Sequence, residues 1–291
     1  MKQLLILSGK GGTGKTTVAC SFIELSQAEA FADCDVDAPN LEIVLKNLGS
    51  LNKSDFYGLD KAYIDQSLCI SCGLCQSHCA YGAISFKESY EVDNLSCEGC
   101  GVCEFVCPVK AIKMVPDVAG ELKLFENEKV FSTAQLKMGS GNSGLLVTKV
   151  KKQMMASANS TDLAIIDGSP GVGCPVLASI SGVDMVLIVT EPSLSGISDL
   201  KRIVETTKNF NCQIAVCINK YTDNIDKTKI IEEYCKDNKI NFVGQIPFDY
   251  RAVKAINSRK TLVAVEGPAK QAVKDIYHRT LDLLFDKEGI I

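Results

Sequence analysis

The chain has 291 residues, of which 46% are hydrophobic and 23% charged, the composition of an ordinary globular protein. This composition excludes an intrinsically disordered, collagen-like or coiled-coil protein. The formal net charge is −4, and no run of Lys and Arg exceeds two residues, so we expect no nucleic-acid partner. Fourteen cysteines are an unusual excess that calls for a chemical explanation.

The apolar runs are of strand length, too short to cross a membrane, and the first is followed at once by Ser8-Gly9-Lys10, which is no secretory signal. We therefore expect a cytoplasmic protein. Disulfides are rare in the reducing cytosol, so the cysteine excess predicts metal or redox chemistry. The stretch 271–285 is amphipathic with a mixed-charge polar face, which favours a docked surface helix over a membrane anchor.

Apolar runs of strand length alternate with helix-length segments along most of the chain. The expected strands are Gln3–Leu7, Glu29–Ala32, Leu163–Ile166, Met185–Thr190, Ile214–Ile218 and Asn241–Ile246. The expected helices are Thr16–Gln27, Leu145–Ala158, Gly196–Asn209, Asp226–Asp237 and Ala269–Phe285. This order predicts an α/β fold with a doubly wound, mostly parallel sheet, whose ligand site lies at the carboxyl ends of the strands.

The alternation breaks between about Asp55 and Pro116, where eight of the fourteen cysteines fall. Two alternating stretches follow, Glu121–Phe125 and Lys129–Gln135, with turn residues between them. They predict a hairpin that joins an inserted module back to the sheet.

We accordingly divide the chain into three segments. Residues 1–57 and 118–291 are expected to form the two parts of one α/β domain, and residues 58–117 an inserted module. The glycine-rich stretch 138–144 favours a flexible linker over a mobile segment near a cluster or a partner.

The segment Ser8–Thr17 follows the first expected strand and opens the first expected helix. From Gly9 to Thr16 it matches G-x-x-x-x-G-K-T, in which backbone N–H groups surround phosphate oxygens at the positive end of the helix. Lys15 of this pattern can reach the β- and γ-phosphates, and Thr16 can place its hydroxyl on Mg²⁺. The residues expected to bind the nucleotide here are Gly11, Gly12, Thr13, Gly14, Lys15, Thr16 and Thr17.

Lys10, a second lysine inside this loop, resembles the deviant phosphate loop of the MinD/ParA class of ATPases, which includes the nitrogenase iron protein. The resemblance implies that the nucleotide is ATP, that the protein hydrolyses it, and that ATP closes a homodimer. In such a dimer Lys10 would cross the interface and touch the nucleotide of the other subunit.

Further segments fit the same class. The resemblance implies that Asp35, in the switch I segment Asp33–Asp37, orients the attacking water and the Mg²⁺ shell, with support from Asp33. It also implies that Asp167 is the Walker B carboxylate for Mg²⁺ and that residues 168–171 form switch II. The adenine contacts of the class fall on Asn219, whose amide offers a donor and an acceptor, and on Pro247 and Asp249.

The inserted module carries an internal repeat. Cys69, Cys72, Cys75 and Cys79 have the spacing C-x₂-C-x₂-C-x₃-C, which Cys97, Cys100, Cys103 and Cys107 repeat 28 residues later. Three thiolates of such a run bind one [4Fe–4S] cluster, and the fourth binds the cluster of the other half. The expected ligand sets are therefore Cys69, Cys72, Cys75 and Cys107 for cluster 1, and Cys97, Cys100, Cys103 and Cys79 for cluster 2.

The alternative of tetrahedral zinc is disfavoured, because zinc sites pair two short Cys-x-x-Cys units rather than tight runs of four. The repeat resembles bacterial two-cluster ferredoxins over about residues 60–116. Six cysteines remain outside it: Cys20, Cys34, Cys174, Cys212, Cys217 and Cys235. Most are expected to act as small apolar residues. Cys34, within switch I, and Cys174, just beyond switch II, stay open as ligands of an additional metal or shared cluster.

Taken together, the chain resembles MinD-superfamily P-loop ATPases with an inserted ferredoxin domain, related to the Mrp-type ATPases. The leading hypothesis is an ATP-gated iron–sulfur protein that delivers electrons to a partner metalloprotein. A second hypothesis is an ATPase that assembles or inserts iron–sulfur or other metal cofactors. A third is a positioning ATPase of the MinD/ParA kind, in which the clusters are structural or sense redox state.

Overall fold

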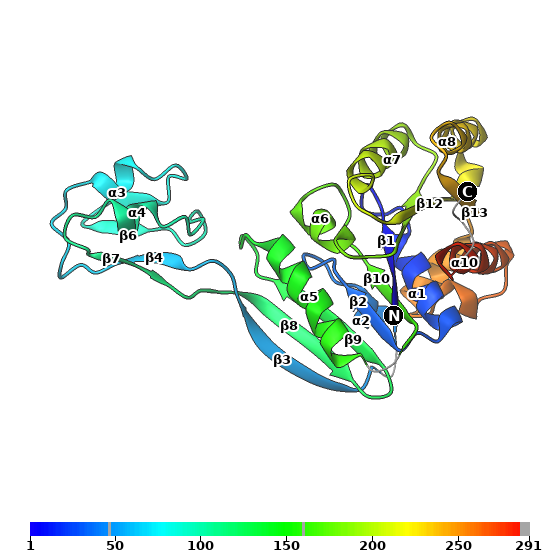
Figure 1. The fold of residues 1–291 in the computed structure, drawn as a ribbon, viewed down its shortest axis with the longest axis horizontal. Coiled ribbons are helices and arrows are strands. Elements are labelled where there is room, and N and C mark those ends of the chain that lie inside the picture. Colours follow the sequence, from blue (N-terminus) through cyan, green and yellow to red (C-terminus); the bar gives the residue numbers. More distant parts are fainter. Residues whose placement is uncertain (46–47, 159–160, 286–291) are drawn as a thin grey trace.

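The structure is a computed structural model that describes residues 1–45, 48–158 and 161–285. Within these residues the chain forms a large α/β body and a small lobe that projects from one side of it (Figure 1). A long two-stranded ribbon connects the lobe to the body (Figure 1).

The body is built on a nine-stranded sheet within the described residues. Across the sheet the order is β13 (Asn241–Ile246), β12 (Gln213–Asn219), β11 (Met185–Thr190), β1 (Lys2–Leu7), β10 (Leu163–Asp167), β2 (Ala30–Asp33), β9 (Val130–Leu136), β8 (Val118–Glu126) and β3 (Ser50–Tyr57). Neighbours from β13 to β9 pair in parallel, whereas β9, β8 and β3 pair antiparallel. The predicted large, mostly parallel α/β sheet is confirmed.

Helices cover both faces of this sheet. One face packs against α5 (Ser143–Ser157), α6 (Cys174–Ile180), α7 (Leu194–Thr207) and α8 (Ile225–Asp237). The opposite face packs against α1 (Lys15–Ser26), α2 (Leu41–Val44), η2 (Leu262–Ala264) and α10 (Pro268–Phe285). Two short elements, η1 (Tyr221–Asp223) and α9 (Tyr250–Asn257), follow the carboxyl ends of β12 and β13.

This double cover explains the strand composition, because a strand buried on both faces must be apolar along its whole length. Every residue of β10 and β11 is buried, and all but the first of β1. The amphipathic C-terminal helix α10 places Val273, Ile276 and Leu284 in the core, as its pattern predicts. In the ranges that the structure describes, no helix is long and apolar enough to cross a membrane.

The lobe lies between β3 and β8 in the chain. It contains the antiparallel pairs β4 (Lys61–Ile64) with β7 (Ile112–Val115) and β5 (Ile84–Phe86) with β6 (Tyr90–Val92), and the one-turn helices α3 (Leu74–Ser77) and α4 (Val102–Phe105). A small core of its own includes Cys75, Cys97 and Cys103, packed with Ile64 and Ile112. Three cysteines are therefore part of the apolar interior of the lobe.

The expected hairpin is present, since β8 and β9 pair antiparallel from Gly120 with Leu136 to Glu126 with Val130. The strand β3 is absent from the sequence prediction, because seven of its eight residues are exposed and carry no apolar pattern. Pairing with β8 at the edge of the sheet, rather than burial, holds this strand in place.

The segment 138–144 is not the free linker that its glycines suggest. Helix α5 already begins at Ser143, and a side chain at Gly139 or Gly141 would meet Leu95 and Glu98 of the lobe at 3.2 and 3.3 Å. These two glycines therefore allow the loop to approach the lobe closely. Its position beside the lobe agrees with one part of the less favoured interpretation, a segment near the cysteine module. Mobility of the segment and contact with a partner stay predictions.

Because the lobe has its own core and leaves the body where β3 and β8 are paired, we expect it to be dispensable for folding of the body. Replacing residues 58–117 with a short Gly-Ser turn should give a protein that still unfolds in one cooperative thermal transition, measured by circular dichroism. This protein should also still bind nucleotide. Aggregation or loss of the cooperative transition would contradict the division of the chain at residues 57 and 118.

Candidate functional site

The loop after β1 is shaped by contacts that exclude side chains from its glycines. Gly14 caps α1 with a φ of 96°, and a Cβ there would lie 2.2 Å from Nδ2 of Asn219. That Nδ2 donates a hydrogen bond of 2.7 Å to the carbonyl of Thr13. The loop is thus held between the start of α1 and the end of β12, at the carboxyl edge of the sheet.

Lys15 and Thr16, the first residues of α1, both point to one carboxylate. Nζ of Lys15 lies 2.6 Å from Oδ1 of Asp167, the last residue of β10, and Oγ1 of Thr16 donates to Oδ2 at 2.7 Å. Asp35 completes the group, with its Oδ2 4.0 Å from Nζ of Lys15. The structure therefore brings together four residues that the sequence analysis assigned to phosphate and Mg²⁺ chemistry.

Lys15 and Asp167 are buried and Asp35 is half-buried, so their charges are strongly coupled. Burial opposes the charge of Lys15, but the carboxylates of Asp167 and Asp33 outweigh it and raise the pKa of the ammonium. Burial, together with repulsion from Asp167, raises the pKa of Asp33 to about 7. Burial likewise raises the pKa of Asp35, against the pull of Lys15. The cluster carries more carboxylates than cations, which suits a site that takes up a divalent cation.

Asp33 organises the switch I segment from within. Its carboxylate accepts hydrogen bonds from the backbone N–H groups of Asp35, Asn40 and Leu41 at 2.8 to 3.0 Å. Ser169, in the switch II segment, donates from Oγ to the carbonyl of Cys34 at 2.6 Å, and both residues are buried. The two predicted switches are therefore joined directly by a buried hydrogen bond.

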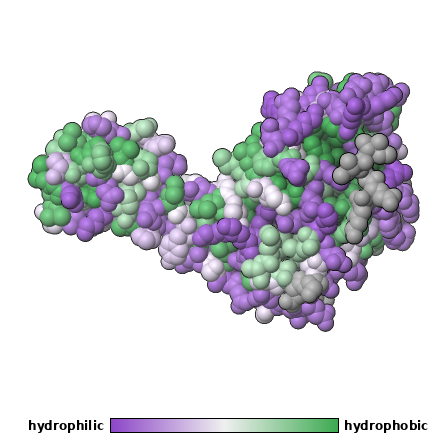
Figure 2. Space-filling view, viewed as in Figure 1, coloured by the Kyte–Doolittle hydropathy of each residue, from purple (hydrophilic) through white to green (hydrophobic). Residues whose placement is uncertain are grey.

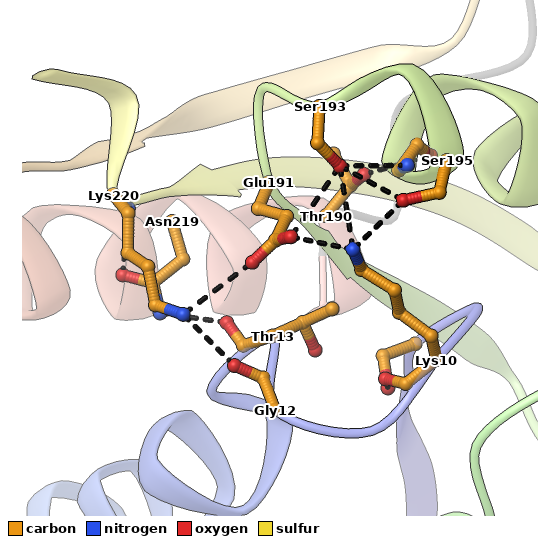
Figure 3. Close-up of polar contacts among 11 residues, drawn as sticks. Lys10, Gly12, Thr13, Thr190, Glu191, Ser193, Ser195, Asn219 and Lys220 are labelled. Atoms are coloured by element: carbon orange, nitrogen blue, oxygen red, sulfur yellow. Dashed lines mark hydrogen bonds and ion pairs between the residues drawn. The ribbon is translucent and has the colours of Figure 1, made fainter. Parts of the chain in front are cut away.

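Lys10 folds back onto its own chain. Its Nζ lies 2.6 Å from Oε1 of Glu191 and donates to Oγ of Ser195 at 2.8 Å (Figure 3). Lys220 reaches the same Glu191 carboxylate at 3.4 Å and donates to the carbonyl of Gly12 at 2.9 Å (Figure 3). Burial opposes the charge of Glu191, yet the two lysines outweigh it and lower the pKa of this carboxyl. Glu191 thus bridges two lysines beside the loop.

A hollow beside the loop is lined by the residues expected to hold adenine. Asn219, Pro247 and Asp249 all face it, with Phe248 and Gly14. Oδ1 of Asn219 accepts from the backbone N–H of Lys220, so both ends of this amide are engaged within the chain. The Asp249 carboxylate is fixed by Arg251, at 2.9 and 3.1 Å.

The cysteine repeat is also a structural repeat. Ser71 and Gly99 have positive φ, as do Gly73 and Gly101, and each pair stands 28 residues apart. The backbone N–H groups of Ala83 and Ala111 donate to Sγ of Cys79 and Cys107 at 3.4 and 3.2 Å. The N–H of Asp65 donates to the carbonyl of Ala111, and that of Asp93 to Ala83, so each half bonds to the other.

This exchange between halves fits the donor set expected of two clusters. Cys79 of the first half lines one small hollow with Cys97, Cys100 and Cys103 of the second. These are the four residues of the second predicted ligand set, and four thiols are the donors that a [4Fe–4S] cluster uses. One of them, Cys79, also accepts a backbone N–H···S bond. Within the described residues, no three His, Cys, Asp or Glu side chains are arranged around a single metal ion.

The other six cysteines differ in access. Cys20, Cys34, Cys217 and Cys235 are buried, Cys212 is partly exposed, and Cys174 is exposed at the start of α6. Burial raises the pKa of Cys34 to about 12, so its thiol is protonated near neutral pH. A protonated, buried thiol is a poor metal ligand, whereas the exposed Cys174 remains open as one.

Sequence reasoning gave no role to Glu191, Ser195 or Lys220. Their sequence signal is position. Glu191 and Lys220 directly follow the carboxyl ends of β11 and β12, where ligand sites of α/β sheets lie, and Ser195 stands in the first turn of α7. The partner that Lys10 takes depends on how α7 packs against the loop, which a sequence pattern does not encode.

Comparison with known proteins agrees with this geometry. The family model of the CobQ/CobB/MinD/ParA nucleotide binding domain matches residues 4–263, so the chain belongs to this family. The MinD protein of Pyrococcus horikoshii, solved as a complex with Mg-ADP, has the same fold, with a TM-score of 0.57, 17% identity and 99% coverage of both chains. The chain is therefore a nucleotide-binding protein of MinD/ParA type.

Relatives match along nearly the whole chain. An uncharacterised protein of Methanocaldococcus jannaschii is 29% identical over 97% of both chains. An iron–sulfur cluster carrier protein of Pyrococcus abyssi is 23% identical over 99% of this chain and 88% of its own. The septum site-determining protein MinD of Bacillus subtilis is 22% identical over 96% of this chain and 89% of its own.

The bond between the switches can be measured through stability. Ser169→Ala should lower the free energy of unfolding by about 1–3 kcal/mol, because the buried carbonyl of Cys34 loses its donor. Thr206→Ala removes a hydroxyl-to-carbonyl bond that is exposed on α7 and should change stability by less than about 0.5 kcal/mol. If the two substitutions change the free energy of unfolding in urea equally, the bond between the switches adds no more stability than an exposed helix bond.

Proposed function

We propose that the chain is an ATPase whose nucleotide state controls electron delivery from two [4Fe–4S] clusters to a partner metalloprotein. The observation that carries the proposal is the group of Lys15 and Asp167, both buried, with the half-buried Thr16 and Asp35. This group lies at one end of a chain of contacts that reaches the cysteine lobe.

At the nucleotide site, Lys15 exchanges Asp167 for the β- and γ-phosphates of ATP. Thr16 and Asp167 then share the Mg²⁺ that accompanies the nucleotide, and Asp35 orients the attacking water and the metal shell. The negative excess of the buried group favours this uptake of a cation. Asn219 and the hollow at Pro247 and Asp249 receive the adenine ring.

In the lobe, Cys69, Cys72, Cys75 and Cys107 hold one cluster, and Cys97, Cys100, Cys103 and Cys79 hold the other. Bound [4Fe–4S] clusters supply one-electron transfer at a potential set by charge, hydrogen bonds and solvent exposure. The N–H groups of Ala83 and Ala111, which donate to Sγ of Cys79 and Cys107, are hydrogen bonds of this kind.

Contacts between the two sites support a coupling. Ser169 ties switch II to switch I, and the chain then enters α6 at Cys174. A side chain at Gly144 of α5 would meet the backbone of Cys174 at 3.2 Å, so these two helix starts are in close contact. The loop before α5 in turn lies against Leu95 and Glu98, next to the ligand Cys97. A movement of switch II therefore has a packed route to the second cysteine run.

The partner contact is expected on the lobe. Ile70 and Phe105 stand between ligand cysteines and are 61% and 90% exposed. In Figure 2 apolar residues cover much of the visible lobe surface. Electron-transfer contacts are small and transient, so a few exposed apolar side chains around the clusters suffice for one.

The proposal is tested by the rate of electron release from the full-length protein. Anaerobic protein reduced with dithionite, then freed of reductant, is mixed with oxidised cytochrome c in stopped flow. ATP·Mg²⁺ and ADP·Mg²⁺ should give rates that differ about fivefold or more, the range of ordinary coupling free energies. Lys15→Met, which cannot hold the phosphates, should remove the difference; equal rates for wild type in both nucleotides would refute the gating.

A carrier of iron–sulfur clusters is a second candidate, favoured by the name of the Pyrococcus abyssi relative and by the exposed thiols of Cys72 and Cys100. The two functions differ in what leaves the protein. A carrier loses iron to an apo-ferredoxin during ATP turnover, whereas an electron-transfer protein keeps its iron and acid-labile sulfide unchanged.

If Lys10 acts across a homodimer, it must first leave its ion pair with Glu191, and this leads to a further prediction. In Glu191→Gln the association constant of ATP-dependent dimers, measured by sedimentation, should rise about two- to fivefold. The reason is that Lys10 then has no partly exposed ion pair to break, which in the wild type is worth about 0.2–1 kcal/mol. Glu266→Gln, which removes an exposed pair with Lys270, is the matched control and should have no effect. Unchanged or weaker dimers in Glu191→Gln would contradict this role of Lys10.

A further inference from the structure

Lys61 is a buried lysine that the nucleotide chemistry does not use. It lies on β4, only 7% exposed, and its Nζ donates a hydrogen bond to the backbone carbonyl of Cys97. Within the described parts of the chain, Lys61 forms no ion pair with a carboxylate. Burying an ammonium without an anion is costly, so its position calls for a negative charge close by.

The repeat has no second lysine at the equivalent position. Shifting Lys61 by the 28 residues of the repeat leads to Ser89, which is neutral. The first run, from Cys69 to Cys79, therefore lacks the cation that the second run has. Exposed acidic groups beside the second run, Glu98 and Glu104, face water, which screens their charge much more than that of a buried group.

We propose that Lys61 is a positioning and charge-setting residue that splits the potentials of the two predicted clusters. Because of Lys61, the cluster held by Cys97, Cys100, Cys103 and Cys79 has the higher reduction potential of the two. This inference rests on the proposed function, because it requires the clusters to be present.

The physical reason is charge. Four thiolates and a cubane core of charge +2 sum to −2, and one-electron reduction takes the core to +1 and the sum to −3. No bond forms or breaks in this step, and the electron comes from an external one-electron donor, dithionite in the test. A buried ammonium beside Cys97 stabilises the −3 state more than the −2 state, and so favours the electron on that side.

The test compares six variants of the full-length protein by EPR at a series of fixed ambient potentials, four at lysines and two at ligand cysteines. Lys61→Met removes the charge and the donor, Lys61→Gln removes the charge but keeps a donor, and Lys61→Arg keeps both. Lys113→Met removes an exposed ammonium from β7 and is the control for a general charge effect. Cys72→Ser and Cys100→Ser, which each alter one exposed ligand, assign the two signals.

We expect Lys61→Met and Lys61→Gln to lower the higher potential alone. The ratio of reduced to oxidised cluster at a fixed ambient potential should fall about tenfold, equivalent to about 59 mV for one electron. The signal that moves should be the one altered by Cys100→Ser, with Lys61→Arg and Lys113→Met unchanged.

Three results would overturn the inference. The first is that both potentials stay unchanged in Lys61→Met and Lys61→Gln. The second is that the potential that shifts belongs to the signal altered by Cys72→Ser. The third is that Lys61→Met shifts the potential while Lys61→Gln behaves as wild type. If Lys61→Met loses iron, Lys61→Gln and Lys61→Arg still decide between charge and hydrogen bond. Wild-type protein that binds no [4Fe–4S] cluster overturns the proposed function and this inference together, whereas two clusters that ignore Lys61 overturn the inference alone.

Discussion

The contact between Lys15 and Asp167 is the constraint on which the site depends. Lys15 lies at the junction of β1, β10 and α1. Among the residues that the structure describes, it is the one cation in contact with the carboxylate group of Asp167 and Asp35. Such a group is stable because the lysine neutralises part of the charge, and it is unbalanced enough to favour a further cation. The parallel sheet supplies the geometry, since the carboxyl ends of its central strands meet at this edge.

The lobe depends on the same sheet through its edge. β3 and β8 extend the sheet beyond β9 and lead into the lobe, while the loop before α5 lies against Leu95 and Glu98. The lobe therefore has two connections to the nucleotide side, one covalent and one through packing. Lys61 adds an asymmetry to the two cysteine runs that their identical spacing conceals. On both proposals together, the second cysteine run, which contacts the body through Leu95 and Glu98, also holds the cluster with the higher reduction potential.

Much of this was predictable from the sequence, for identifiable reasons. The central strands are apolar throughout because both faces are buried, so β10 and β11 were located to within a residue. The G-x-x-x-x-G-K-T motif was enough to predict that Lys15 and Thr16 belong to the site, because this spacing is typical of a loop that binds phosphate. The strand β3 was missed because edge pairing needs no apolar pattern. The partners of Lys10 and Lys61 were missed because they come from segments far away in the chain, Glu191 and Cys97.

The central claim is that nucleotide state reaches the clusters, and the cluster potentials test it most directly. Both potentials would be determined by EPR in anaerobic full-length protein, without nucleotide and with ATP·Mg²⁺, in wild type and in Lys15→Met. The account predicts that ATP·Mg²⁺ shifts the potential of the Cys97 side in wild type and leaves Lys15→Met unchanged. Identical potentials with and without ATP·Mg²⁺ in wild-type protein that binds the nucleotide would contradict it.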